Sequence, residues 1–290
     1  MADPFDSAWL KWGQAVLHAH DLFDQINALH LTEENFCKTT TEYNAKSHCV
    51  TLRVVWLADF PPAICLSLGD VVHNYRSCLD HIAWALVRQG ATPPPGLSEW
   101  EQAGVYFPIC STRDQFDASL VTVRRNGRVV KRAKLPGVAA ADIAKVRRYQ
   151  PYKNPKRKLD LHVFTILEEL SNRDKHRQIS PIFVVPEEVL VFTWPPQDCE
   201  VTRDPPRHSA AKPLQLDTEI HRVYVRKTGP NPRMQMHPQL TVQPCITPRV
   251  AVREWLTQTR SYVVQLLREF AAPPLGTLEE LGVLDVVTIS

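Results

Sequence analysis

One stretch decides the fold of this chain, residues 66–86: LSLGDVVHNYRSCLDHIAWAL. Pro61 and Pro62 precede it and Gly90 follows it, which is typical of the start and the end of a helix. Its apolar residues recur at three- and four-residue spacing, so one face of the helix is predicted to be buried. The other faces carry polar side chains that are unusual for a surface helix: Asp70, His73, Asn74, Arg76, Asp80 and His81. We therefore predict a central helix over 63–89 that carries the functional chemistry.

The composition of the 290-residue chain, with 44% hydrophobic and 22% charged residues, is that of an ordinary globular protein. No apolar run approaches the roughly 20 residues that span a bilayer, and the first residues lack the features of a signal peptide. The seven cysteines are scattered without a C-x-x-C pair, which argues against a disulfide framework or a zinc site. We expect a cytoplasmic protein without a membrane partner, a metal or a cofactor.

Several motifs of common enzymes are missing from the sequence. It contains no P-loop, no G-x-G-x-x-G and no G-x-S-x-G. These absences exclude the common NTPases, dinucleotide-dependent enzymes and α/β-hydrolases. The remaining function classes do not depend on a glycine-rich phosphate loop.

The positive charge of the chain is concentrated in one segment. The net charge is +3, but residues 124–158 hold 13 Lys and Arg against the single acid Asp142, which leaves +12 there and 3 − 12 = −9 elsewhere. A basic segment on an acidic body indicates a polyanionic partner such as nucleic acid, and a solvated basic loop is the alternative. The RNA contacts predicted in this segment are Arg124, Arg125, Arg128, Lys131 and Arg132.

The hydrophobic periodicity predicts four long helices, over about 6–43, 63–89, 159–179 and 248–270. Thr247 is expected to cap the last of them, with Pro248 at its first position. Shorter helices are predicted near 112–119 and over 140–149. An alternating strand is predicted over 48–56, a two-residue hairpin turn at Asn126-Gly127, and a small antiparallel sheet within 181–247.

The helix predicted over 159–179 has an acid on its apolar side. Its buried face, extended by four residues, reaches Asp174. A carboxylate on a core face is costly unless it is paired. We therefore expect this helix to pack on the central helix and to bring Asp174 near Arg76 or His73.

Arg76 and His81 form an R-x4-H pair on the central helix. Histidine serves readily as a general acid or base near neutral pH, and a fixed arginine stabilises a phosphate in its transition state. Five residues of helix separate the two side chains by roughly 140°, so one phosphate is reached more easily if a second protomer contributes its copy. The alternative is structural, with Arg76 bonded to Asp80 and His81 in a buried contact.

Two sequence blocks carry a family resemblance, G-D-x-x-H-N-x-R-S-x-L-D-H at 69–81 and N-x-D-K-H-R at 172–177. Together with F-P-I at 107–109 and Q-P-Y at 150–152, they resemble a group of uncharacterised bacterial proteins. The first block is also similar to the HEPN superfamily, whose R-x4-6-H signature marks metal-independent endoribonucleases with active sites at a homodimer interface. This resemblance implies that Arg76 and His81 are the catalytic pair. The β-rich stretch 181–247 departs from a minimal HEPN domain.

We accordingly predict a mainly α fold of the α+β kind, an HEPN-like helical bundle with a small antiparallel sheet inserted before the C-terminal helix. The helical core spans 1–180 with a basic excursion at about 121–158, the β-rich insertion spans 181–247, and 248–290 returns to the core. The predicted function is a metal-independent endoribonuclease related to defence or to toxins. It is expected to act on RNA as a homodimer. An inhibitor or antitoxin protein is a further expected partner. The alternatives are a non-catalytic module that binds nucleotides, RNA or protein, and a small-molecule enzyme.

The predicted site residues fall into two groups. The catalytic set combines the central helix with the second block: Arg76, His81, Asp80, His73, Asp174 and His176. Lys175 and Arg177 of the second block join the basic segment as RNA contacts.

Overall fold

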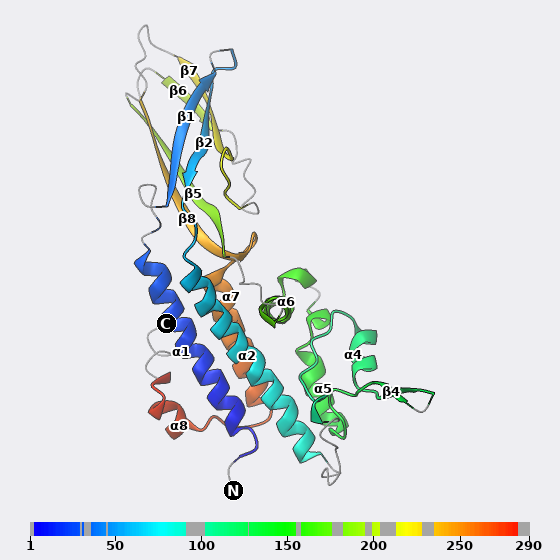
Figure 1. Ribbon diagram of the computed structural model, residues 1–290. Coiled ribbons are helices and arrows are strands. Elements are labelled where there is room, and N and C mark those ends of the chain that lie inside the picture. The colour runs from blue at the N-terminus through cyan, green and yellow to red at the C-terminus, as the bar shows by residue number, and fades with distance from the viewer. Residues whose placement is uncertain are drawn as a thin grey trace. The chain divides into compact units, whose positions relative to one another are not determined.

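The computed structural model describes residues 3–29, 31, 36–44, 46–90, 102–126, 128–154, 158–175, 182–194, 199–203, 213–227 and 235–283 (Figure 1). Within them the helices are α1 (Asp6–Ala28), α2 (Pro62–Gln89), α4 (Arg113–Ser119), α5 (Ala140–Arg148), α6 (Val163–Lys175), α7 (Val252–Arg268) and α8 (Leu275–Glu280), with 3-10 turns at Pro151–Lys153 and Leu159–Leu161. The strands are β1 (Cys37–Asn44), β2 (Cys49–Leu57), β3 (Val123–Arg125), β4 (Arg128–Lys131), β5 (Phe183–Trp194), β6 (Cys199–Arg203), β7 (Glu219–Lys227), β8 (Gln235–Thr247) and β9 (Val250–Ala251).

The chain divides into two compact units. The helical unit comprises Met1–Phe23, Cys65–Ser180 and Trp255–Ser290, and the sheet unit comprises Asp24–Ile64 and Pro181–Glu254. Each unit has a hydrophobic core of its own.

The helical unit is organised around α2, as the sequence predicts. Its apolar face is buried along its whole length: Leu68, Val71, Val72, Tyr75, Leu79, Ile82 and Leu86. Helices α1 and α7 lie beside it (Figure 1), and the Trp12 indole N–H of α1 donates to the carbonyl oxygen of Arg260 of α7 at 3.4 Å. Among the described helices, none combines the length and the apolar character that crossing a bilayer requires.

A short hairpin belongs to the helical unit and projects from the region of α4 and α5 (Figure 1). Strands β3 and β4 pair antiparallel, Arg125 stands opposite Arg128, and Asn126 follows Arg125 in the turn. Asn126 has a φ of 52°, the left-handed conformation that a two-residue hairpin turn requires and that asparagine tolerates. The predicted hairpin and the predicted helices near 112–119 and 140–149 are confirmed.

The sheet unit contains two antiparallel sheets, with strand orders β1-β2-β7-β6 and β5-β8-β9. The β2 strand alternates as predicted, with Val50, Leu52 and Val54 buried. Leu52 and Val54 belong to a core cluster that draws on both sheets and includes Val184 and Leu240. Residues far apart in the chain thus build this core. In the first sheet, β2 pairs directly with β7, which is also distant from it in the sequence.

The predicted fold class is wrong. The described residues form a mixed α+β structure with three antiparallel sheets, and not a mainly α bundle with a single inserted sheet. The helix predicted over 6–43 ends at Ala28, and Cys37–Asn44 forms β1 instead. This segment contains three consecutive threonines, whose branched side chains favour strands, and β2 offers it a pairing partner.

The start of the C-terminal helix also differs from the prediction. Strand β8 extends to Thr247, Val250 pairs with Thr247 across a tight turn, and α7 begins only at Val252. The Thr247 hydroxyl accepts from the Arg249 N–H at 3.3 Å, so its capping bond serves this turn. The helix predicted over 159–179 begins at Val163, and residues 176–180 lie outside the described residues.

Candidate functional site

Arg76 is buried, with 5% of its surface exposed, and its guanidinium is held at three points. Nη1 donates to Glu168 Oε2 of α6 at 2.9 Å, and Nη2 donates to Asp80 Oδ1 and to the Phe107 carbonyl oxygen, both at 3.0 Å. Asp80 Oδ1 in turn accepts from the Phe107 N–H at 2.9 Å. The guanidinium therefore ties α2 to α6 and to the segment that contains the F-P-I block.

This arrangement leaves little room for a phosphate at Arg76. Two carboxylates already face one guanidinium, and an incoming phosphate would have to displace at least one of them. Removing either partner of a buried ion pair is costly, so the network is structural in character. The Arg76–Asp80 pair considered as the structural alternative is confirmed.

Glu168 is a site residue that the sequence analysis missed. Its signal is positional, because the buried Phe164 and Ser171 lie four residues before it and three residues after it on the same side of α6. The carboxylate expected to meet the central helix was that of Asp174, on the extended apolar face. The predicted packing of α2 on α6 is confirmed, but Glu168 provides the acid that meets Arg76.

His81 faces a different neighbour from Arg76. Its Nδ1 lies 2.9 Å from the Ser7 hydroxyl of α1. Burial lowers the pKa of His81, and the charge of Lys11 lowers it further, while Asp80 acts in the opposite direction. His81 is thus in contact with α1 and Arg76 with α6, as expected from their separation around the helix. Within one chain the R-x4-H pair does not converge on one point.

The other predicted catalytic residues lie at the surface or outside the described structure. His73 and Asp174 are exposed. The expectation that Asp174 is buried is wrong, because its side chain is exposed to solvent. Its Oδ1 lies 3.5 Å from the position that a Cβ on Gly69 would take, so it does adjoin α2. The Lys175 side chain, His176 and Arg177 lie outside the described residues.

The β3–β4 hairpin presents the predicted basic side chains to solvent. Arg124, Arg125, Arg128 and Lys131 are exposed, and Val130 is 60% exposed beside them. Across the described part of the chain, no acid forms an ion pair with any of the three hairpin arginines. Arg125 and Arg128 stand directly opposite one another, although like charges in that position destabilise a strand pair.

Arg132, at the base of the hairpin, has a different role. A Cβ on Gly104 would come within 2.6 Å of the Arg132 Cδ, so the aliphatic part of this side chain packs closely over the glycine backbone. Gly104 is therefore required for this contact, and Arg132 is half-buried. We separate it from the solvent-exposed arginines of the hairpin.

The cations of α5 are neutralised, in contrast to those of the hairpin. Lys145 Nζ lies 2.9 Å from Asp142, Arg147 lies 2.7 Å from Asp117 and Arg148 lies 2.8 Å from Glu269. The strongly basic segment of the sequence is thus not uniformly available to a ligand. Among the described residues, the exposed arginines of this segment without an ion pair are those of the hairpin, and the exposed Lys153 and Lys158 have none either.

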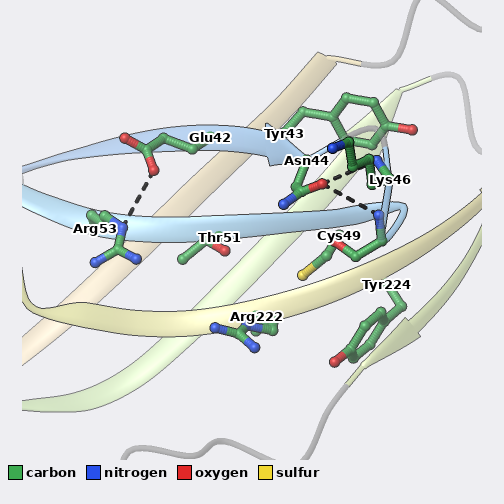
Figure 2. Close-up of a pocket in the computed structure, with 10 residues that line it drawn as sticks. Glu42, Tyr43, Asn44, Lys46, Cys49, Thr51, Arg53, Arg222 and Tyr224 are labelled. Carbon is green, nitrogen blue, oxygen red and sulfur yellow. Dashed lines mark hydrogen bonds and ion pairs between the residues drawn. The ribbon is translucent and has the colours of Figure 1, made fainter.

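The sheet unit contains a pocket of about 840 Å³ that the sequence analysis did not predict. Side chains of β1, β2 and β7 line it (Figure 2). Arg53 Nε lies 3.3 Å from Glu42, and Glu219 lies 2.8 Å from Arg222 and 3.5 Å from Arg53. The residues that line the pocket include one acid, Glu42, and three cations, Lys46, Arg53 and Arg222, so the pocket is polar and carries an excess of positive charge.

The signal for this pocket is present in the sequence only in part. The β2 strand alternates, and Cys49, Thr51 and Arg53 lie on the face opposite its buried valines. The facing Arg222 and Tyr224 come from a strand about 170 residues later, and the register that places Thr51 opposite Arg222 is a property of the folded sheet.

The comparisons add no relative to this picture: protein-family models, curated proteins and solved structures give no match to the chain. Among the described residues, no group of three or more His, Cys, Asp and Glu side chains is arranged to hold a metal ion.

Proposed function

We propose that this protein binds RNA through the β3–β4 hairpin. The observation that carries the proposal is the pairing of Arg125 with Arg128, next to Arg124, without a neutralising acid among the described residues. Phosphate groups would relieve the repulsion between these charges, and the release of counterions from the nucleic acid would favour the complex. The hairpin is short and exposed, so its arginines can reach a backbone without rearrangement of the core.

A binding role is better supported than catalysis by the R-x4-H pair. The guanidinium of Arg76 is buried among Asp80, Glu168 and the Phe107 carbonyl, and His81 contacts a different helix. An arginine that stabilises a reacting phosphate has to be accessible to it. The metal-independent ribonuclease, with catalysis at a homodimer interface, stays a prediction that the same experiment tests.

The test is fluorescence anisotropy with a labelled single-stranded RNA over a series of salt concentrations. The triple variant Arg124→Ala, Arg125→Ala and Arg128→Ala is expected to reduce affinity at least about tenfold. It should also reduce the slope of log K against log salt by about 2, since each lost contact to a single strand removes roughly 0.7. A specific role for the hairpin would thus appear in both affinity and salt dependence.

A matched control removes the same number of charges elsewhere. The variant Arg113→Ala, Arg148→Ala and Arg173→Ala deletes three side chains, each of which is already paired with an acid. It is expected to keep most of the affinity and the wild-type slope. Equal losses in the two triple variants would contradict the proposal, because they would reflect net charge alone.

An RNA cleavage assay in the presence of EDTA distinguishes binding from catalysis. The expected result is that wild-type protein binds the RNA and leaves it intact. Products ending in 2′,3′-cyclic phosphates, formed by the wild type and lost in a folded His81→Ala variant, would instead establish the ribonuclease.

A further inference from the structure

The β3–β4 hairpin is exposed on both of its faces, whereas β2 buries one of its own. Among the described residues from 121 to 131, all are exposed except Val129, which is half-buried. The hairpin projects from the region of α4 and α5 (Figure 1). A strand pair without a third strand or a packed helix is only marginally stable by itself, so this projection indicates a role in binding.

The register of the hairpin places cations on both of these faces. Arg125 and Arg128 stand directly opposite one another and therefore share one face. Lys131 joins that face, because it pairs with Val123, two residues before Arg125. Arg124 precedes Arg125 along β3, so its side chain belongs to the other face. A ligand that contacted a single face would leave the charge of the other face without a partner.

The base of the hairpin is anchored in the helical unit. The Lys134 N–H donates to the carbonyl oxygen of Ser119, the last residue of α4, at 2.8 Å, and the Ala133 N–H donates to the Thr122 hydroxyl at 3.2 Å. The arms beyond this base are three and four residues long. At about 3.3 Å per residue they extend for roughly 10–13 Å. This length is comparable to the depth of a nucleic-acid groove, which is about 8.5 Å for the B-form major groove.

We propose that the hairpin inserts into the major groove of an RNA duplex at a bulge, an inference that rests on the proposed RNA binding. Phosphates line both walls of a groove, so Arg125 and Arg128 would contact one strand and Arg124 the other. A two-stranded ribbon fits a groove about 12 Å wide, whereas the major groove of a regular A-form RNA helix is too narrow. Unpaired nucleotides widen that groove locally, because they interrupt the stacked helix.

A β-bulge in β4 suits the hairpin to a helical groove. Val129 and Lys131 have cross-strand partners, so Val130 between them is the extra residue. Such a residue increases the right-handed twist of a strand pair and redirects a side chain. Val130 is 60% exposed. An apolar side chain gains nothing from phosphates, so its exposure among cations favours a ligand that also offers the edges of bases.

The test is fluorescence anisotropy of the full chain with three labelled RNAs: a single strand, a fully paired duplex and the same duplex with a bulge. The bulged duplex is expected to bind at least about tenfold more tightly than either of the others at equal salt concentration. Equal affinities for the three RNAs, all reduced by the triple hairpin variant, would overturn groove insertion and leave the proposed RNA binding intact. Affinities that the triple hairpin variant leaves unchanged would instead contradict the proposed function itself.

Single substitutions on the two faces of the hairpin test the insertion directly. Arg124→Ala and Arg125→Ala are each expected to weaken binding of the bulged duplex at least about threefold and to reduce the slope of log K against log salt by about 0.9. Arg113→Ala is the matched control, because Arg113 is exposed and paired with Asp117. Circular dichroism reports whether each variant folds. A response to one hairpin substitution and not to the other would show binding on a single face and would overturn the proposal.

Dimethyl sulfate footprinting identifies the groove. The reagent methylates guanine N7, an atom that lies in the major groove. Guanines beside the bulge are expected to be protected by the wild-type protein and to stay reactive with the triple hairpin variant at the same concentration. Full reactivity of these guanines in a saturated complex would overturn the insertion. A DNA duplex bound more tightly than the bulged RNA would overturn the assignment of RNA as the ligand.

Discussion

Arg76 and the arginines of the β3–β4 hairpin are the same chemical group in opposite surroundings. Arg76 is enclosed by two carboxylates and a carbonyl oxygen, whereas Arg125 faces Arg128 across the hairpin. The Arg76 guanidinium is engaged in contacts that stabilise the fold. The guanidinium groups of Arg125 and Arg128 repel one another at the surface. The difference indicates that the R-x4-H arginine stabilises the structure and that the hairpin arginines are available to a ligand.

Arg76 and the hairpin arginines should differ most in what they contribute to the free energy of unfolding. Arg76→Ala should lower the free energy of unfolding by about 3 kcal/mol, because it leaves Asp80 and Glu168 facing one another without a cation. Arg124→Ala, on the hairpin, should change it by no more than about 0.5 kcal/mol. Chemical denaturation monitored by circular dichroism measures both. Equal effects of the two substitutions would show that Arg76 stabilises the fold no more than Arg124 does.

A second buried polar side chain in the same unit, that of Gln150, should stabilise the fold as Arg76 does. Gln150 is fully buried, and its side chain accepts from the Cys110 N–H at 3.0 Å and donates to the carbonyl oxygens of Pro108 and Val146. Gln150→Ala should cost about 2 kcal/mol of unfolding free energy, since these buried groups lose their partner.

The matched control for Gln150 is an exposed glutamine. Gln115 accepts from the Ser111 N–H, but both residues are in contact with solvent, which can replace the bond. Gln115→Ala should therefore cost less than about 1 kcal/mol in the same denaturation experiment. A larger loss of unfolding free energy for Gln115→Ala than for Gln150→Ala would show that the buried bonds of Gln150 do not stabilise the fold as expected.

The smallest expected effect concerns the pH dependence of stability. Burial and Lys11 lower the pKa of His81 in the folded state below its value of about 6.5 in the unfolded chain. The unfolded state then binds more protons, so stability falls as the pH decreases through 6.5 towards the folded-state pKa.

Denaturation midpoints at two pH values, one above and one below the pKa of free histidine, measure this effect. His81→Gln is expected to lose less stability on acidification than the wild type. His73→Gln, at an exposed position of the same helix, is the matched control and should follow the wild type. A wild-type pH dependence in His81→Gln would show that His81 contributes nothing to it.

The elements that the sequence predicts correctly are those with strong local signals. The apolar spacing of α2, the alternation of β2 and the pairing of β3 with β4 each depend on residues within a few positions of one another. The helix predicted through residue 43 fails because pairing with β2 outweighs a weak helical pattern in a threonine-rich segment. The prediction for Asp174 fails because extending the apolar face of α6 by four residues places it on a buried side, whereas its side chain is exposed.

Taken alone, the sequence determines a central helix with a buried face, a basic hairpin and an alternating strand. The partner that each polar side chain meets was decided only in the tertiary structure. Arg76 bonds to Asp80 four residues away, which helical spacing predicts, and to Glu168 92 residues away, which it does not. The physical reason is that a side chain's burial and charge environment come from segments distant in the chain, and these decide whether an arginine supports the fold or remains available to a ligand.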